Sequence, residues 1–153
     1  MIKSTNHVGI SVSNLDRAIK FYCDAFGMET AAQISFDSQT EGGRYERILG
    51  LKDVAGRVAL LRADNMQVEL FEFSHPRPRP ADLNRPVSDH GISHFCIEVT
   101  DIEGHCERLR AAGATFHCPP LTFFGRSMAT YARDPEGNVL ELFERKNPDP
   151  RPA

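Results

Sequence analysis

The sequence predicts an α+β fold made of two βαβββ modules, and two observations support this assignment. The phrase HVGISV, beginning at His7, returns as HFCIEV beginning at His94, and a helical pattern follows each copy. Each half then closes on a similar phrase, VELFE from Val68 and LELFE from Leu140. An internal repeat of this kind indicates a duplicated structural unit.

The first module is expected over residues 1–73. It begins with a strand over 6–12, and the segment from Ser13 to Asp16 then has the form of a capping box. Apolar residues recur at helical spacing after it, and Gly27 supplies the left-handed residue at which a helix stops. Three strands are predicted to follow, over 29–36, 56–63 and 66–73, with Asp64-Asn65 as the turn between the last two.

The second module is expected over residues 91–145 and repeats this order. A strand over 93–99 leads into the capping box Thr100 to Glu103, and the helix ends at Gly113. Strands are predicted over 114–118, 127–133 and 138–144, with the turn DPEGN from Asp134 before the last.

Three segments lie outside this repeat. The first half is longer than the second, and its additional residues fall mainly over 37–55, where we expect a mobile loop that carries specificity. Residues 74–90 form a proline-rich linker that is expected to be extended. Residues 146–153, with three prolines, are expected to form a flexible tail.

Composition excludes several classes of partner. The chain of 153 residues carries a net charge of −3, which gives no reason to expect nucleic acid or a membrane surface as a partner. No apolar run reaches the roughly 18 residues needed to span a bilayer, and the N-terminus lacks the apolar core of a signal peptide. We therefore expect a cytoplasmic protein whose four cysteines are reduced.

Strand alternation predicts where the repeated histidines and glutamates point. Successive side chains of a strand face opposite ways, so the aliphatic residues of each strand pack under the helix and His7 and His94 point away from it. Glu69 and Glu141 also lie opposite the aliphatic residues of their strands, beside apolar neighbours. A carboxylate placed there must be paired, protonated or bound to metal. Two imidazoles and two carboxylates suit one divalent cation: Zn²⁺, Co²⁺, Ni²⁺, Mn²⁺ or Fe²⁺.

Other polar and aromatic residues are assigned smaller roles. Glu72 and Glu144 are expected to be solvated strand ends or salt-bridge partners, since they share the helix side of their strands. His90 and Ser93 are candidates to orient His94. Aromatic residues are predicted to wall the site for a small organic molecule, with core packing as the alternative: Phe36, Phe71, Phe73, Phe123, Phe124 and Phe143.

Four phrases in order resemble the vicinal oxygen chelate superfamily, which includes glyoxalase I, methylmalonyl-CoA epimerase, extradiol dioxygenases and resistance proteins. They are HVGISVSNLDRAIKFY from His7, QVELFE from Gln67, HGISHFCIEVTDIE from His90 and DPEGNVLELFE from Asp134. The resemblance implies paired modules whose sheets form a curved cup around a metal. It also implies His7, Glu69, His94 and Glu141 as the ligands, and a homodimer as the common assembly.

The resemblance and the ligand set together point to proton transfer next to a carbonyl. A substrate that chelates the ion through two adjacent oxygens would lose an α proton to give an enediolate, which the metal stabilises as a Lewis acid. The chain would then be an isomerase, epimerase or lyase. Glu141, as a ligand able to detach, and Glu46 in the inserted loop are the candidate bases, with Glu41 a weaker one.

Three other functions remain open, one of which is a thiol transferase of the fosfomycin-resistance type, because no sequence feature excludes it. Extradiol-type dioxygenases that use Fe²⁺ commonly hold it with two histidines and one carboxylate, and a fourth ligand at Glu69 argues against this reading. A non-catalytic resistance-type protein that only binds a small molecule would not need four ligands. Oxygen consumption would favour the dioxygenase, and ligand binding insensitive to chelators would favour the binding protein.

Overall fold

The computed structural model describes residues 1–146 of the chain, so the predicted tail over 146–153 lies outside the described residues except for its first residue. The chain divides into two compact units, Met1–Pro80 and a second one that begins at Ala81. The division falls inside the predicted linker. Each unit is α+β and repeats one topology, as predicted.

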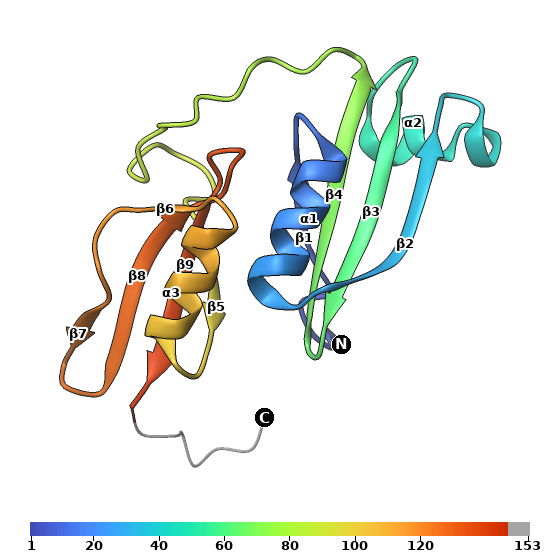
Figure 1. Ribbon diagram of the computed structural model, residues 1–153. Helices are drawn as coiled ribbons and strands as arrows, with labels where there is room; N and C mark the ends of the chain where they lie inside the picture. The colour runs from blue at the N-terminus through green and yellow to red at the C-terminus, as the bar shows by residue number, and fades with distance from the viewer. Residues whose placement is uncertain (147–153) are drawn as a thin grey trace. The chain divides into compact units, whose positions relative to one another are not determined.

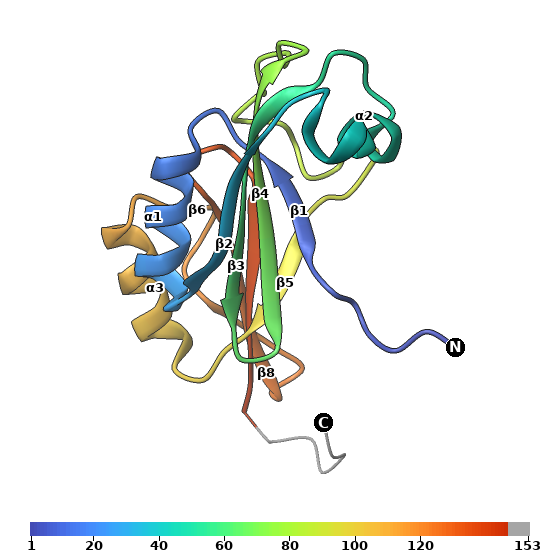
Figure 2. The ribbon, with the colours of Figure 1, turned by 90° about the vertical axis from the view of Figure 1, so that its right-hand side faces the viewer.

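The first unit contains one four-stranded sheet with the strand order β1-β4-β3-β2. β1 is parallel to β4, and the other neighbours are antiparallel. Helix α1 covers one face of this sheet (Figures 1 and 2). The elements are β1 (Val8–Ser11), α1 (Leu15–Phe26), β2 (Glu29–Phe36), η1 (Thr40–Gly42), α2 (Arg44–Leu49), β3 (Ala55–Ala63) and β4 (Met66–His75).

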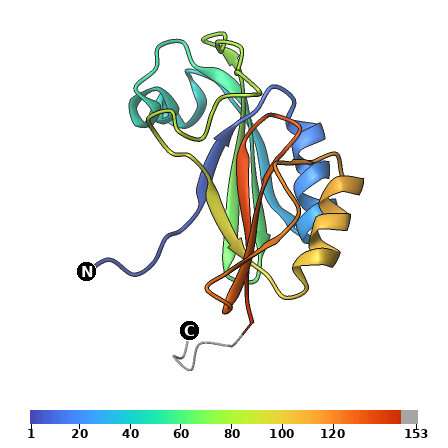
Figure 3. The ribbon, with the colours of Figure 1, turned by 90° about the vertical axis from the view of Figure 1, so that its left-hand side faces the viewer.

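The second unit repeats this topology in a five-stranded sheet of order β5-β9-β8-β6, with β7 also paired to β8. Its helix α3 covers one face of that sheet (Figure 3). Strand β7 was not predicted from the sequence. The elements are β5 (Phe95–Glu98), α3 (Ile102–Ala111), β6 (Thr115–Phe116), β7 (Leu121–Phe123), β8 (Ser127–Arg133) and β9 (Val139–Arg145).

Strand register confirms the internal repeat residue by residue. In the first unit Gly9 of β1 lies opposite Glu69 of β4, and in the second Cys96 of β5 lies opposite Glu141 of β9. Both His residues directly precede their strands, so each strand starts one residue after the histidine. The same parallel pairing thus brings each repeated histidine beside a repeated glutamate.

The aliphatic face of each sheet forms the core under its helix. Val68 and Leu70 in β4 and their equivalents Leu140 and Leu142 in β9 are fully buried. The helices contribute buried side chains to the same layers, including Leu15, Tyr22, Ile102 and Leu109. Because alternate residues of a strand face opposite ways, burial of these residues leaves the intervening glutamates on the other face.

The helix caps differ from the predicted capping boxes. Asn14, and not Ser13, caps α1, because its side chain accepts a hydrogen bond from the Arg17 N–H. Asp101, and not Thr100, caps α3, and its carboxylate accepts from the Gly104 N–H. In both helices the residue that caps is the one whose short side chain reaches the free N–H groups of the first turn.

The final glutamate of each repeated phrase also binds the start of a helix. Glu72 accepts a hydrogen bond from the Leu15 N–H and pairs with Arg57, whose Nε lies 2.7 Å from its carboxylate. Glu144 accepts from the Asp101 and Ile102 N–H groups. The predicted salt-bridge role is correct for Glu72. Neither carboxylate is merely a solvated strand end, because each satisfies backbone donors that the helix leaves unpaired.

Glu72 gives the first unit a specific dependence on acid. Its pKa is lowered mainly by the hydrogen bond from Arg57 and also by the Leu15 N–H. A depressed pKa stabilises the fold above the group's ordinary value of 4.5, and this contribution is lost as pH falls through the folded-state value. We expect Glu72→Gln to lower the free energy of unfolding at pH 7 by about 1–2 kcal/mol. Denaturant titrations measure the free energy of unfolding at pH 7 and at pH 3. This free energy should fall less between the two pH values for the variant than for the wild type, and an equal fall would contradict this assignment.

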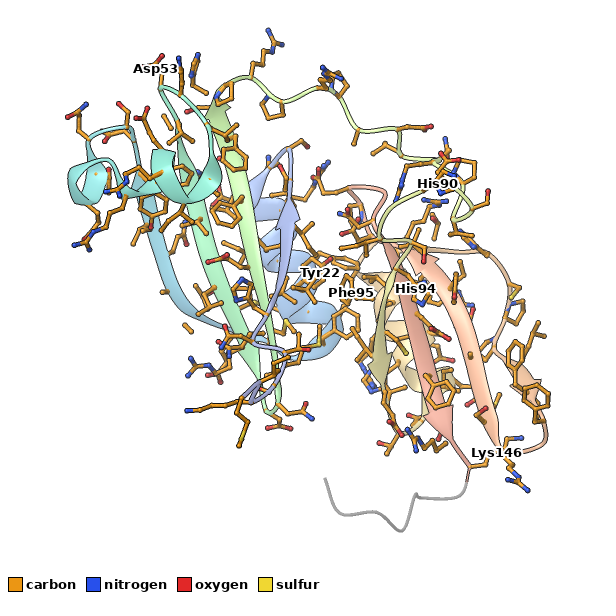
Figure 4. All side chains as sticks on the ribbon, turned by 180° about the vertical axis from the view of Figure 1, so that it is seen from behind. Tyr22, Asp53, His90, His94, Phe95 and Lys146 are labelled. Atoms are coloured by element: carbon orange, nitrogen blue, oxygen red, sulfur yellow. The ribbon has the colours of Figure 1, made fainter. Side chains whose placement is uncertain are left out.

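The inserted segment is ordered, contrary to the predicted mobile loop over 37–55. It contains η1 and α2, and α2 packs Tyr45 and Leu49 against the buried cluster around Phe36. Glu46 accepts a hydrogen bond from the Asp53 N–H, while the Asp53 carbonyl contacts His75 Nδ1 at 2.7 Å. Asp53, labelled in Figure 4, lies in the connection between α2 and β3. Burial of apolar side chains and these polar contacts fix a segment whose glycines and charges resemble a loop.

Part of the predicted linker is fixed to the second unit. The Arg133 guanidinium donates to the carbonyl oxygens of Arg85 and Gly137. A Cβ atom at Gly137 would lie 2.6 Å from the Cα atom of Leu83, so this position requires glycine. The segment that leads into His94 is therefore held against the sheet that carries Glu141.

Candidate metal centre

In the first unit the predicted ligands His7 and Glu69 lie together. The Nε2 atom of His7 is 3.3 Å from Oε2 of Glu69, and their side chains are 40% and 29% exposed. His7 is positioned by β1 and Glu69 by β4, on the sheet face opposite α1. The pairing therefore follows from the parallel register of the two strands.

The second unit brings His94 and Glu141 together in the same way. The Nε2 atom of His94 is 3.0 Å from Oε2 of Glu141, and these side chains are 26% and 19% exposed. Figure 4 labels His94 at the start of β5. Each unit thus presents one imidazole and one carboxylate at matching points of its sheet.

The other ring nitrogen of each histidine is held by the side chain of the preceding residue. Nδ1 of His7 lies 2.8 Å from Oδ1 of Asn6, and Nδ1 of His94 lies 2.8 Å from Oγ of Ser93. Ser93 was predicted as an orienting residue, whereas Asn6 was missed. The signal was present in the sequence, because a polar residue directly precedes each repeated histidine.

This arrangement fits a cation. Because Oδ1 of Asn6 can only accept a hydrogen bond, Nδ1 of His7 carries a hydrogen, and a neutral ring then has an unprotonated Nε2 that faces a carboxylate oxygen. Two lone pairs at this distance need a proton or a metal ion between them. Ligand atoms about 2.1 Å from an ion lie about 3.0 Å apart at right angles and about 3.4 Å apart in a tetrahedron. Both observed separations fall in that interval.

Each pair supplies half of the predicted ligand set. Within residues 1–146 the structure forms no cluster of three or more histidine, cysteine, aspartate or glutamate side chains that could hold an ion. His7 and Glu69 belong to one unit, and His94 and Glu141 to the other. That a single ion binds both pairs therefore stays a prediction.

Tyr131 is a polar neighbour of the second pair that the sequence did not reveal. It lies opposite Glu141 in the β8–β9 register, and its hydroxyl is 3.4 Å from Nε2 of His94. Burial, and then the Glu141 carboxylate, raise the pKa of Tyr131. The phenol therefore stays protonated at neutral pH and is a hydrogen-bond donor beside the pair. Only the strand register shows that Tyr131 adjoins Glu141.

Cys96 is a second neighbour of Glu141. The two residues face each other across β5 and β9. Burial of the thiol, followed by the charge of Glu141 and a hydrogen bond to it, raise the pKa of Cys96 to about 12. The thiol therefore stays protonated and contacts the carboxylate as a donor.

The other candidate bases lie in the inserted segment. The Glu46 carboxylate binds the Asp53 N–H, and Glu41 forms an ion pair with Arg44. These contacts occupy both side chains within the segment itself, whereas Glu141 lies beside His94, Tyr131 and Cys96. Of the predicted bases, Glu141 is the one with acid–base partners around it.

The predicted aromatic wall separates into two groups. Phe36, Phe71 and Phe73 pack on one another together with Tyr45, whose ring stacks on Phe36 with centroids 4.7 Å apart. Their role is core packing at the end of the Glu69 face. Phe123 and Phe124 belong to β7 and its turn, where Phe124 is 96% exposed, and Phe143 follows Glu141 on the same face of β9.

Comparisons with known proteins identify the family to which the chain belongs. Residues 4–142 match the model of the Glyoxalase/Bleomycin resistance protein/Dioxygenase superfamily, and the chain therefore belongs to that superfamily. This confirms the resemblance drawn from the four sequence phrases.

No helix within residues 1–146 is long and apolar enough to cross a membrane.

Individual relatives include enzymes of two kinds. The chain is 34% identical over 146 residues to a 2-epi-5-epi-valiolone epimerase of Actinomyces sp., an alignment that covers 91% of this chain and 78% of the relative. It is 28% identical to the lactoylglutathione lyase of Haemophilus influenzae, over 92% of each chain. Against the lactoylglutathione lyase of Schizosaccharomyces pombe it spans 49% of that protein, with 24% identity.

Solved structures share the fold. A glyoxalase family protein from Bacillus cereus aligns with a TM-score of 0.85 and 23% identity, over 96% of this chain and 97% of that one. Glyoxalase I from Zea mays aligns with a TM-score of 0.60 and 21% identity, and there the chain covers 45% of the larger protein. At these identities the structures establish the architecture alone.

Proposed function

We propose that this protein is a metal-dependent isomerase, epimerase or lyase that moves a proton on the carbon next to a carbonyl group. The observation that carries the proposal is the duplicated His–Glu pair, with Nε2-to-Oε2 separations of 3.3 and 3.0 Å at the same strand position in each unit. Membership of the superfamily and the epimerase and lyase names of its relatives support the same reaction class.

His7, Glu69, His94 and Glu141 would together hold one divalent ion from the set Zn²⁺, Co²⁺, Ni²⁺, Mn²⁺ and Fe²⁺. We also propose that the two sheets form a cup around that ion, either within one chain or across a homodimer. When bound, the ion supplies Lewis-acid stabilisation of the negative charge that develops on the substrate oxygens. Neutral imidazoles and two carboxylates balance its charge.

The chain's own residues would carry the proton. Glu141 accepts the α proton, because in the second unit it lies opposite two residues with acid–base groups, Cys96 and Tyr131. Both of its neighbours are protonated at neutral pH: Cys96 donates a hydrogen bond to the Glu141 carboxylate, and the Tyr131 hydroxyl lies 3.4 Å from Nε2 of His94. Ser93 keeps the His94 ring oriented through Nδ1. The equivalent neighbours in the first unit are Leu60 and Gly9, which cannot take part in proton transfer.

Metal analysis followed by isotope exchange tests the proposal. Protein purified without added metal is assayed for bound ions, and small hydroxy-carbonyl compounds are then incubated with it in D₂O. The panel includes lactoylglutathione and 2-epi-5-epi-valiolone, the compounds for which the lyase and epimerase relatives are named. Deuterium uptake at the α carbon, abolished by a chelator, is expected. Oxygen consumption without exchange would instead favour an Fe²⁺ dioxygenase, and chelator-insensitive binding without turnover a resistance-type binding protein.

Tyr131→Phe tests the assignment of acid–base work to the second unit. The variant keeps the ring beside His94 and removes only the hydroxyl, so metal content and folding should be unchanged. Loss of the hydroxyl group beside Nε2 of His94 should lower kcat about 10-fold, with a smaller change in KM. Steady-state kinetics over a range of pH measure this effect; a kcat within twofold of the wild type would contradict it.

A further inference from the structure

His94 lies at a boundary where strand pairing fixes the chain on one side alone. Strand β5 begins at Phe95, which lies opposite Leu140 in the parallel pairing with β9. Residues 76–94 before it belong to no helix or strand. The direction of the His94 imidazole depends on the backbone that enters it, so other contacts must hold that backbone.

Two arginines of the second unit form such contacts in series. The guanidinium of Arg133, on β8, donates to the carbonyl oxygen of Arg85 at 2.7 Å and to a carbonyl oxygen of the turn before β9 at 3.0 Å. The guanidinium of Arg85 in turn donates to the carbonyl oxygen of Ile92 at 2.9 Å, two residues before His94. The loop over residues 82–92 is therefore attached at one end to the sheet and at the other end to the approach to His94.

The loop has internal contacts that fix Arg85 itself. The Arg85 N–H donates to the carbonyl oxygen of Asp82 at 3.1 Å, and the Asn84 N–H donates to the Asp82 carboxylate at 2.9 Å. His90, which was also a candidate to orient His94, lies on this loop (Figure 4) and forms no hydrogen bond within residues 1–146. The connection to His94 therefore runs through the arginines.

We propose that Arg85 and Arg133 are positioning residues for the metal centre, because they fix the backbone before His94 and so hold its imidazole beside Glu141. This inference rests on the proposed function, in which both His94 and Glu141 are ligands. The two side chains lie 3.0 Å apart, and a metal ligand must stay within about 0.5 Å of its productive position. Neither arginine would contact the ion or the substrate.

The sign of the effect separates positioning from electrostatics. Both arginines are cations, and Arg133 lies two residues along β8 from Tyr131, on the same face of the sheet. The Tyr131 hydroxyl is 3.4 Å from Nε2 of His94. If the arginines acted through charge alone, their removal would strengthen the binding of a divalent cation, because like charges repel. Positioning predicts the opposite result, which is weaker binding.

Binding of Co²⁺ alone to the protein tests this inference. Arg133→Met and Arg85→Met should each weaken Co²⁺ binding about 10-fold, as loss of an orienting partner commonly does at a metal site. The two effects should not add, because the arginines act in series. Arg85→Lys should recover most of the affinity, since one ammonium group can reach one carbonyl oxygen. Arg133→Lys should not, because its planar guanidinium bridges two carbonyl oxygens.

Calorimetry measures the Kd for Co²⁺, and the visible spectrum of the bound ion reports a change in ligand geometry. Glu144→Gln is the matched control, because Glu144 binds the start of α3 and does not contact the loop. It should lower the stability of the second unit and leave the Kd for Co²⁺ within twofold of the wild type.

The outcomes separate this inference from the proposed function. A wild-type protein that takes up no Co²⁺ contradicts the metal centre and the inference with it. A wild-type protein that binds Co²⁺, together with arginine variants that bind it equally well or more tightly, overturns the positioning role alone. If Arg133→Met does not fold, Arg85→Met decides in the same way, because the contact that it removes is exposed to solvent.

Discussion

Replacing Glu141 by Gln is expected to lower turnover by about 10³-fold, within the range that general acid–base catalysis commonly contributes. The substitution keeps the shape of the side chain and removes the charge that faces Nε2 of His94 at 3.0 Å. The proposed centre then loses both a negative ligand and its proton acceptor. We expect bound metal to fall as well, while the thermal midpoint of the metal-free protein changes little. Metal content, kcat and unfolding of the metal-free form measure these three effects.

Glu144→Gln is the matched control for this prediction. Glu144 lies three residues farther along β9, on the opposite face, where it accepts hydrogen bonds from the first N–H groups of α3. Its substitution should cost about 1 kcal/mol of stability, because a charged cap at a helix N-terminus is lost. Metal content and kcat should stay within twofold of the wild type. The assignment of the two carboxylates would be wrong if Glu144→Gln abolished turnover and Glu141→Gln did not.

His7→Ala and His94→Ala are each expected to eliminate the same single bound ion, although the two residues belong to different units. Loss of a ligand should weaken the affinity by about 100-fold or more, because changes to mere orienting partners already cost 10–100-fold. Residual turnover of the double variant should equal that of either single variant, since groups that act as one unit are not additive. Metal stoichiometry after dialysis against a defined metal buffer, together with kcat, measures this coupling.

The alternative is that each His–Glu pair binds independently or binds nothing. In that case His7→Ala would leave an ion at His94 and Glu141 with unchanged affinity, and the effects of the two substitutions would add. Either result would contradict a shared centre. His105→Ala serves as the control, because His105 lies on α3, where burial lowers its pKa, and it takes no part in either pair.

Much of the candidate site was predictable because its residues occur in two copies of an internal repeat. The repeated phrases placed His7 with His94 and Glu69 with Glu141, and period-two alternation put all four side chains on the face away from the helices. The structure brings the members of each pair within 3.3 Å. Such signals can be recognised in a single sequence, because the alternating direction of side chains along a strand depends only on neighbouring residues.

Contacts between distant segments could not be predicted in the same way. Tyr131 adjoins Glu141, and Glu72 binds the start of α1, only because antiparallel and parallel registers align those strands and helices. The inserted segment resembles a loop by composition, yet it contains helix α2. Tyr45 and Leu49 of this helix are partly buried against the cluster around Phe36. Burial overrides local preference whenever a segment finds an apolar surface elsewhere in the fold.

The sequence by itself therefore determined the fold class, the βαβββ order that the two halves share, and the equivalence of His7 with His94 and of Glu69 with Glu141. Only the tertiary structure decided which residues surround those pairs: Tyr131 and Cys96 in the second unit, and Leu60 and Gly9 in the first. The physical reason is that repetition and periodicity are properties of short stretches of chain. The neighbours of a side chain across a sheet depend on strand register, which is set by the packing of the whole unit.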